Sequence, residues 1–197
     1  MRIKNINTII FKANNAPQRL DKVLIDNKIG DKKIAISDVF IKDIIKNEEV
    51  ASTKIVDFIG NGASAYAFET ENGEVLKLSY GSHYPFLRPH ESFDVPIYKQ
   101  GKIGNIYYYF EEKLMQHGMT EGFVEIMRDM IKEKGYRVSD LGSNDLHQIG
   151  LSKKGTLHLI DPECARFKTI FHAFWKKIQT LISNKLSFSR FSKALHK

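Results

Sequence analysis

Apolar residues recur at helical spacing in the first fifty residues of the chain. Residues 16–30, APQRLDKVLIDNKIG, place Pro17 near an expected helix start and Gly30 just beyond its end, an asymmetry typical of helices. Ser37 is an expected N-cap for a second helix. The apolar stripe of that helix is predicted to comprise Val39, Ile41, Ile44 and Ile45. The pattern predicts a strand-like start followed by two helices, without candidate chemistry.

The periodicity changes from helix to strand at Thr53. Residues 53–60, 65–70 and 74–80 predict three strands, and Asn72-Gly73 between the last two is a strong hairpin signal because Asn-Gly accepts positive φ angles. Residues 94–104 and 105–114 predict two more. The expected fold class is therefore α+β, with a five-stranded antiparallel sheet within residues 50–114.

The second half begins with the clearest helix of the chain. Thr120 is its expected cap and Gly135 its expected end, and one face is apolar. That face is predicted to comprise Phe123, Ile126, Met127, Met130 and Ile131. Three short strands are expected within residues 136–161, followed by a helix over residues 169–183 with an apolar face.

The composition fits one soluble globular domain of 197 residues, with 42% hydrophobic and 27% charged residues. The single cysteine excludes an intrachain disulfide, and no signal peptide or transmembrane segment is predicted, so a cytoplasmic location is expected. The net charge of +7 resides in residues 168–197, which contain seven basic and no acidic residues. This tail is interpreted as a solvated helix face or, alternatively, as a contact for an anionic surface; no nucleic-acid-binding fold is indicated.

The glycine-rich segment 60–65 and the lysine that follows it are the first candidate site. The segment joins two strands rather than a strand and a helix, which argues against a dinucleotide-binding turn, and no G-x-x-x-x-G-K-[ST] motif is present. Backbone N–H groups of such a hairpin can approach phosphates. Lys77, between Leu76 and Leu78, could then contact them as a point charge. The alternative is that Lys77 is an edge-strand lysine that prevents aggregation.

Side chains with metal-binding oxygens gather in the second half of the sequence. Asp161 ends an apolar strand directly before Pro162, and Asp140, Asn144 and Asp145 follow the long helix. A hard divalent metal, such as one bound to nucleotide phosphates, prefers oxygen ligands of this kind. The alternative is that Asp140 and Asp161 cap turns.

The order of these parts resembles the protein-kinase fold. The motifs are IGNGASAYAF for the glycine-rich loop, VLKL for the third-strand lysine, YYYFEEKL for the strand that enters the hinge, VSDLGSND for the catalytic loop, and LIDPE in place of Asp-Phe-Gly. The resemblance covers residues 55–166 and is greatest to the very small kinase-like proteins of bacteria and their phages, including minimal type III effector kinases. It implies one domain, with a helical extension (1–50), an N-lobe (51–114) and a reduced, mainly helical C-lobe (115–197).

The resemblance implies a set of nucleotide contacts. Gly60, Gly62 and Ser64 in the glycine-rich loop would cover the phosphates of ATP, and Lys77 would contact the α- and β-phosphates as part of the catalytic machinery. The backbone from Glu112 to Leu114 would meet the adenine. ATP and Mg²⁺ are the implied cofactors.

The same resemblance implies the catalytic and metal-binding roles. Asp140 would orient the acceptor hydroxyl and accept its proton, and Asp161 would bind Mg²⁺. Asn144 or Asp145 would bind a second metal. Counting back from Asp161 by the separation usual in the family instead reaches Gln148, so the sequence leaves three candidates for this ligand.

The chain departs from the family pattern at several positions. No His-Arg pair precedes Asp140, and Pro162-Glu163 stands where the family has Phe-Gly. The helix that normally supplies a glutamate partner for the lysine must be very short, and Glu91 is the candidate for that partner. Only 36 residues follow Asp161, too few for the large substrate-binding half of an ordinary kinase.

The sequence thus predicts an ATP- and Mg²⁺-dependent serine/threonine protein kinase of minimal effector or phage type. Its expected partner is a protein substrate, with a host protein as one candidate. Beyond the cytoplasm of the producing cell, delivery into a host cell by a non-classical route is the alternative location. Two alternative functions stay open: a pseudokinase that serves as a protein-binding module, and a small-molecule kinase.

Overall fold

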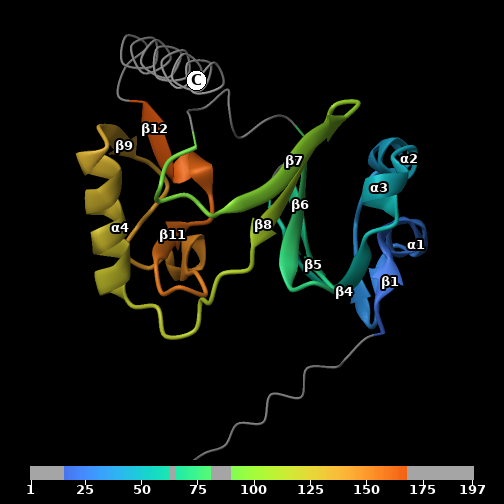
Figure 1. Cartoon of the computed structure of the whole chain (residues 1–197), viewed down its shortest axis with the longest axis horizontal. Coiled ribbons are helices and arrows are strands. Elements are labelled where there is room, and N and C mark those ends of the chain that lie inside the picture. Colours follow the sequence, from blue (N-terminus) through green and yellow to red (C-terminus); the bar gives the residue numbers. More distant parts are fainter. Residues whose placement is uncertain (1–15, 63–64, 81–89, 168–197) are drawn as a thin grey trace, which may run out of the picture.

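The computed structural model describes residues 16–62, 65–80 and 90–167 and arranges them in two parts (Figure 1). One part is a large antiparallel sheet with three short helices on its outer side. The other contains helix α4 and several short strand pairs, and it faces the opposite side of the sheet. The protein is therefore α+β, as the sequence predicted.

The sheet has six strands where the sequence predicted five. Its order is β1-β4-β5-β6-β8-β7, and every neighbouring pair is antiparallel. The extra strand β1 has two residues, which pair with the start of β4, and two residues are too few to show a periodicity. The strands are β1 (Gln18–Arg19), β4 (Lys54–Asn61), β5 (Ala65–Thr70), β6 (Glu74–Tyr80), β7 (Ile97–Ile103) and β8 (Ile106–Glu112).

The N-terminal segment forms more elements than the two helices expected. The first helix ends at Asp26 and is capped by Asn27, which adopts the left-handed conformation at φ 51°, so the prediction that Gly30 lies just beyond the helix end is wrong. Gly30 instead occupies the turn of a small hairpin at φ 54°. The elements are α1 (Leu20–Asp26), β2 (Lys28–Ile29), β3 (Lys32–Lys33), α2 (Asp38–Ile45) and α3 (Glu48–Ala51).

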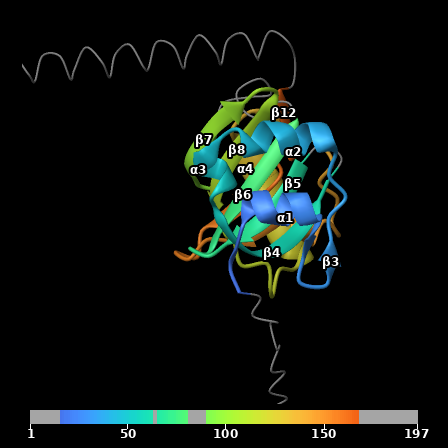
Figure 2. The ribbon, with the colours of Figure 1, turned by 90° about the vertical axis from the view of Figure 1, so that its right-hand side faces the viewer.

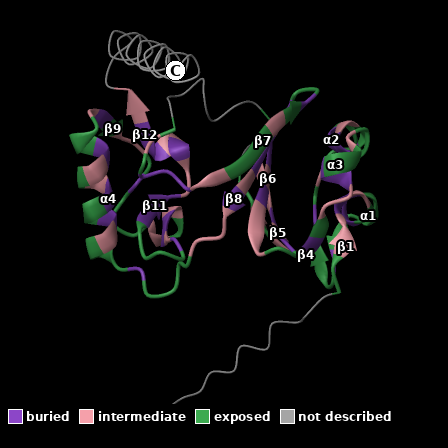
Figure 3. Cartoon of the chain, in the orientation of Figure 1, coloured by how far each residue is buried: buried purple, intermediate pink, exposed green. Residues whose placement is uncertain are grey.

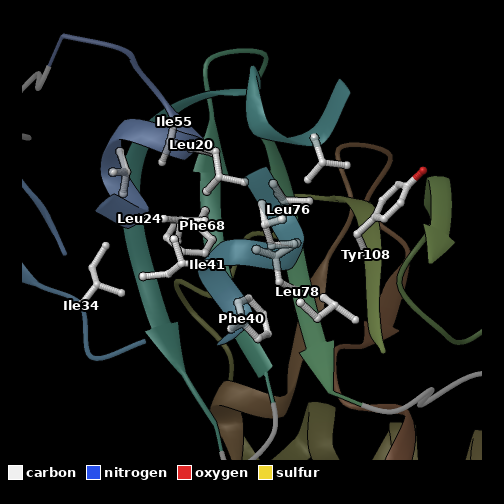
Figure 4. Close-up of a cluster of buried hydrophobic side chains, with 14 of the residues drawn as sticks. Leu20, Leu24, Ile34, Phe40, Ile41, Ile55, Phe68, Leu76, Leu78 and Tyr108 are labelled. Atoms are coloured by element: carbon white, nitrogen blue, oxygen red, sulfur yellow. The ribbon is translucent and has the colours of Figure 1, made fainter. Parts of the chain in front are cut away.

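Helices α1 and α2 cover the outer face of the sheet (Figure 2). Phe68 of β5 and Leu76 and Leu78 of β6 point into this core (Figure 4) and are fully buried. Ser37 caps α2 as predicted, since its hydroxyl accepts a hydrogen bond from Phe40 N at 3.4 Å. The predicted stripe of α2 is partly wrong: Val39 and Ile45 are exposed, whereas Phe40 is buried.

The second part has its own hydrophobic core beneath α4 (Glu121–Glu133). α4 is exposed along its outer side (Figure 3). It buries Val124, Met127 and Ile131, whereas Ile126 of the predicted face is exposed. β9 pairs with β12, and β10 pairs with β11. The short elements are β9 (Tyr136–Val138), the 3₁₀ helix η1 (Leu146–Gln148), β10 (Ile149–Leu151), β11 (Leu157–Leu159), the 3₁₀ helix η2 (Pro162–Cys164) and β12 (Ala165–Phe167).

Two isolated β-bridges connect the two parts. Met115, just after β8, pairs with Leu151 of β10, and Asp94, just before β7, pairs with Leu159 of β11. The predicted C-terminal helix and the basic tail lie outside the described residues. No helix in the described ranges has the length and apolar character needed to cross a membrane.

Candidate functional site

A cavity of about 850 Å³ lies between the inner face of the sheet and the second part. Ala67, Val75 and Lys77 line it from the inner face, where they alternate with the residues of the outer core. Leu114, in the connection between the parts, also lines it, as do residues 160–163 of the second part. The cavity therefore collects side chains from both parts of the molecule.

Lys77 is the least exposed of the three lysines that line this cavity among the described residues. Its Nζ atom lies 3.3 Å from Glu111 Oε2 of β8, and only 14% of the lysine side chain and 3% of the glutamate side chain are exposed. The ammonium also donates a hydrogen bond to the carbonyl oxygen of Ile160 at 3.2 Å. Because β6 lies between β5 and β8, the interpretation of Lys77 as an edge-strand lysine is wrong.

Glu91 is not the partner of Lys77, and that prediction is wrong. Its Oε1 atom accepts a hydrogen bond from the hydroxyl of Tyr136 at 2.6 Å, and its Oε2 atom lies 4.0 Å from Lys134 Nζ. Both contacts belong to the second part. The carboxylate that pairs with Lys77 comes from the sheet itself.

The glycines at the end of β4 border the cavity as expected. Gly60 and Gly62 both line it, and a Cβ atom built on either would meet nothing within 4 Å. The space beside their Cα atoms is therefore open to a ligand, while Gly62 N already donates a hydrogen bond to the carbonyl oxygen of Ala65 at 2.9 Å. Ser64, the third predicted contact in this loop, lies outside the described residues.

Asp161 lines the same cavity as Lys77. It caps η2, where its Oδ1 atom accepts a hydrogen bond from Glu163 N at 2.9 Å. The turn-capping alternative is therefore correct for Asp161 Oδ1. This cap does not exclude a ligand at Asp161 Oδ2. Ile160 N donates a hydrogen bond to the carbonyl oxygen of Gln148 at 2.8 Å, which sets Gln148 beside Asp161.

Of the three candidates for the second metal ligand, only Gln148 lines the cavity. Asn144 is exposed, and the Asp145 carboxylate accepts a hydrogen bond from Gly142 N at 2.7 Å in its own loop. Asp145 therefore stabilises the loop that precedes η1. Within the described ranges, no three His, Cys, Asp or Glu side chains are grouped as a metal site.

Asp140 lies outside the cavity lining but next to the turn that contains Asp161. Its side chain is 72% exposed, with Oδ2 lying 3.3 Å from Arg166 Nη2 and accepting a hydrogen bond from Ser139 Oγ at 2.9 Å. Its backbone is left-handed at φ 49°, which is uncommon outside glycine. Cys164 joins the two loops, since its thiol donates to the Asp140 carbonyl at 3.3 Å and its N–H to the Asp161 carbonyl at 3.1 Å.

Cys164 itself is a structural residue. Burial, together with the nearby carboxylates of Asp161 and Asp140, raises the pKa of its thiol to about 12. A thiol that stays protonated is a poor nucleophile. This residue therefore packs the turn between the two loops.

The connection between the two parts makes a side-chain contact with each part. Glu112 Oε1 accepts a hydrogen bond from Lys153 N at 2.7 Å, and Lys113 Nζ lies 2.5 Å from Glu69 Oε1. Glu112, Lys113 and Leu114 all line the cavity. The segment predicted to contact a base is thus fixed at the cavity wall.

The sequence did not identify several charged groups of the cavity, among them Glu111 and Lys32. Glu111 could have been suspected, because it is an acidic residue in an apolar strand, but pairing it with Lys77 requires the strand register. Lys32 carries no signal in the sequence. It reaches the cavity from the β2–β3 hairpin, where its Nζ atom lies 2.6 Å from Asp57 Oδ1.

The chain matches no protein-family model and no curated protein.

Proposed function

We propose that the protein is an ATP- and Mg²⁺-dependent phosphotransferase of the protein-kinase fold that acts on serine or threonine hydroxyls of a protein substrate. The observation that carries the proposal is the convergence of Lys77, the glycine strand and Asp161 on one cavity between two parts of the chain. The cavity volume lies within the range of about 300–1,000 Å³ that is usual for small-molecule sites.

The apolar portion of the cavity suits a flat base. Ala67 and Val75 offer small side chains on the sheet, and Leu114 lines the connection to the second part. Small residues leave space for a ring, and the backbone of residues 112–114 supplies peptide groups beside it. These residues would bind and orient the adenine.

The polar portion suits phosphates. The space beside the Cα atoms of Gly60 and Gly62 is open, and the ammonium of Lys77 supplies a fixed positive charge. Charges that are held in place before the reaction stabilise the transition state without further reorganisation. Lys77 would neutralise the phosphate oxygens and hold the transferred group in line with the acceptor.

The oxygens at the far side of the cavity suit Mg²⁺. Magnesium is usually bound by one or two protein oxygens together with phosphates and water, and Asp161 with Gln148 supplies a carboxylate and an amide oxygen. Gln148 therefore replaces Asn144 and Asp145 in the proposed ligand set. When bound, the metal would neutralise charge on the phosphates.

Asp140 is proposed to orient the acceptor hydroxyl and accept its proton. Its loop touches the Asp161 turn through Cys164, and its side chain is open to a protein substrate.

The contact of Asp140 with Arg166 favours a second candidate function. This candidate is a pseudokinase that binds nucleotide and a partner without transferring phosphate, because the Asp140 carboxylate is already paired.

The test begins with a thermal shift in Mg²⁺-ATP, followed by γ-phosphate transfer to the protein itself and to a cell lysate. Lys77→Met and Asp161→Asn are each expected to lower transfer by a factor on the order of 100–1,000. Lys99→Met on edge strand β7 and Asp129→Asn on the outside of α4 are the matched controls and should retain transfer.

The outcomes separate the candidates. Stabilisation by Mg²⁺-ATP without transfer supports the pseudokinase. If the wild-type protein shows neither stabilisation nor transfer, or if both cavity variants still transfer phosphate, the proposed function is wrong.

A further inference from the structure

We propose that Glu111 is the positioning residue for Lys77 and that this charged pair is preassembled within the sheet. The inference rests on the proposed function, in which the Lys77 ammonium contacts the phosphates. It adds the residue that holds the ammonium in place and the element that supplies this residue, which the sequence had assigned to Glu91.

The strand register places both side chains on the inner face. Lys77 lies opposite Tyr109 on β8, and Glu111 lies opposite Val75 on β6, so the two residues form a diagonal pair on neighbouring strands. Long side chains in this relation can touch. Here the ammonium and carboxylate are 3.3 Å apart.

Burial makes the partner necessary. A cation removed from water is costly unless an opposite charge compensates it, and Lys77 is mostly buried. Among the residues that the structure describes, Glu111 is the one carboxylate within 4.0 Å of Lys77 Nζ. Two other acidic residues of the cavity contact different groups: Glu69 pairs with Lys113, and Asp161 accepts from Glu163 N.

The two contacts of Lys77 differ in the element that provides them. Seven residue pairs join β6 to β8, so Glu111 and Lys77 move together with the sheet. The Ile160 carbonyl belongs to the second part, so only this contact changes when the parts move relative to each other. The charged pair therefore does not depend on closure of the cavity, on a partner protein or on a modification.

The experiment is a double-mutant cycle with Glu111→Gln, Lys77→Met and the combined variant, with Glu91→Gln as the matched control. Glu91 is another largely buried, hydrogen-bonded carboxylate, but it lies away from the cavity lining. Each variant is measured by urea unfolding without nucleotide and by titration with Mg²⁺-ATP.

Glu111→Gln is expected to weaken Mg²⁺-ATP binding about tenfold or more, the effect typical of losing a residue that orients a ligand contact. On the Lys77→Met background the same change should cause no further loss of affinity. In urea, the combined variant should be less destabilised than the sum of the single variants. Glu91→Gln should leave nucleotide affinity unchanged.

Additive destabilisation in urea would overturn the pairing. The positioning role would be overturned if Glu111→Gln kept full affinity for Mg²⁺-ATP, or if it weakened binding equally on both backgrounds. If the wild-type protein binds no nucleotide, the proposed function fails, and the unfolding cycle still decides the pairing. Should Glu111→Gln not fold, Glu111→Asp, which retains the charge on a shorter side chain, replaces it in both measurements.

Discussion

The two faces of the central sheet are built from alternating residues of the same strands. The outer face is apolar and packed beneath helices, whereas the inner face lines the cavity and carries charged side chains. On β6, Leu76 and Leu78 are fully buried beneath the helices, whereas Val75 and Lys77 line the cavity. On β5, Phe68 enters the outer core and Ala67 the cavity. Because successive side chains of a strand point to opposite faces, neighbouring positions can serve stability and ligand binding separately.

This difference explains why a lysine stands between two leucines. The leucines anchor β6 in the outer core, and this core is completed by the N-terminal helices. The inner face is thereby free to carry charge. The N-terminal segment, for which the sequence predicted no chemistry, supports the site by covering the opposite face with its helices and also contributes Lys32 to the cavity.

The largest expected effect tests the outer face. Phe68→Ala removes a fully buried ring that packs against Phe58 at a centroid distance of 5.3 Å. We expect a loss of about 3–5 kcal/mol in the free energy of unfolding, measured by urea denaturation. A loss below about 1 kcal/mol would contradict the assignment of stability to this face.

The next prediction tests the inner face at the neighbouring position. Ala67→Leu adds bulk inside the cavity, so it should abolish Mg²⁺-ATP binding while changing the free energy of unfolding by less than about 1.5 kcal/mol. Calorimetric titration and urea denaturation measure the two quantities. Unchanged nucleotide affinity would show that the base lies elsewhere.

A smaller effect concerns the core beneath the cavity, and it depends on pH. Folding raises the pKa of the Cys164 thiol from 9.0 to about 12, so the folded state binds this proton more tightly than the unfolded state. The resulting stability is complete below pH 9 and is lost as the pH rises toward 12. Urea denaturation between pH 8 and pH 11 should show this decrease in the wild-type protein, and Cys164→Ala should lack this part of it.

The smallest expected effect lies at the surface. Glu49 of α3 forms an ion pair with Lys99 of β7, and both side chains are substantially exposed. Glu49→Gln should change the free energy of unfolding by less than about 1 kcal/mol and leave nucleotide binding unchanged. A larger loss of stability would mean that the outer face depends on charge as well as on packing.

Features carried by local sequence patterns were predictable. Alternation of apolar residues predicted strands β4, β5, β6 and β8, and Asn72-Gly73 predicted the β5–β6 hairpin, whose glycine has φ 73°. Lys77 and Asp161 were expected at one site, and both line the same cavity. Their roles as nucleotide and metal contacts stay predictions.

Features that depend on register or on loop conformation were not predictable. Glu111 meets Lys77 only because of the pairing between β6 and β8, which no local pattern encodes. Spacing after Asp140 pointed to Asn144 or Asp145 and spacing before Asp161 pointed to Gln148. The turn into η1 brings Gln148 to the cavity. Val39 was assigned to the buried stripe of α2, but in this two-turn helix Phe40 takes the buried position and Val39 is 66% exposed.

The hydrogen bond from Lys77 to the Ile160 carbonyl has a consequence for selectivity. The ammonium has three N–H donors, and Glu111 and the Ile160 carbonyl engage two of them, so a ligand can bind the third donor or replace the carbonyl. A neutral oxygen exchanges one ordinary hydrogen bond for another, whereas an anionic oxygen gains roughly 1 kcal/mol from the charge. Lys77 therefore favours ligands with anionic oxygens over uncharged ligands of the same shape.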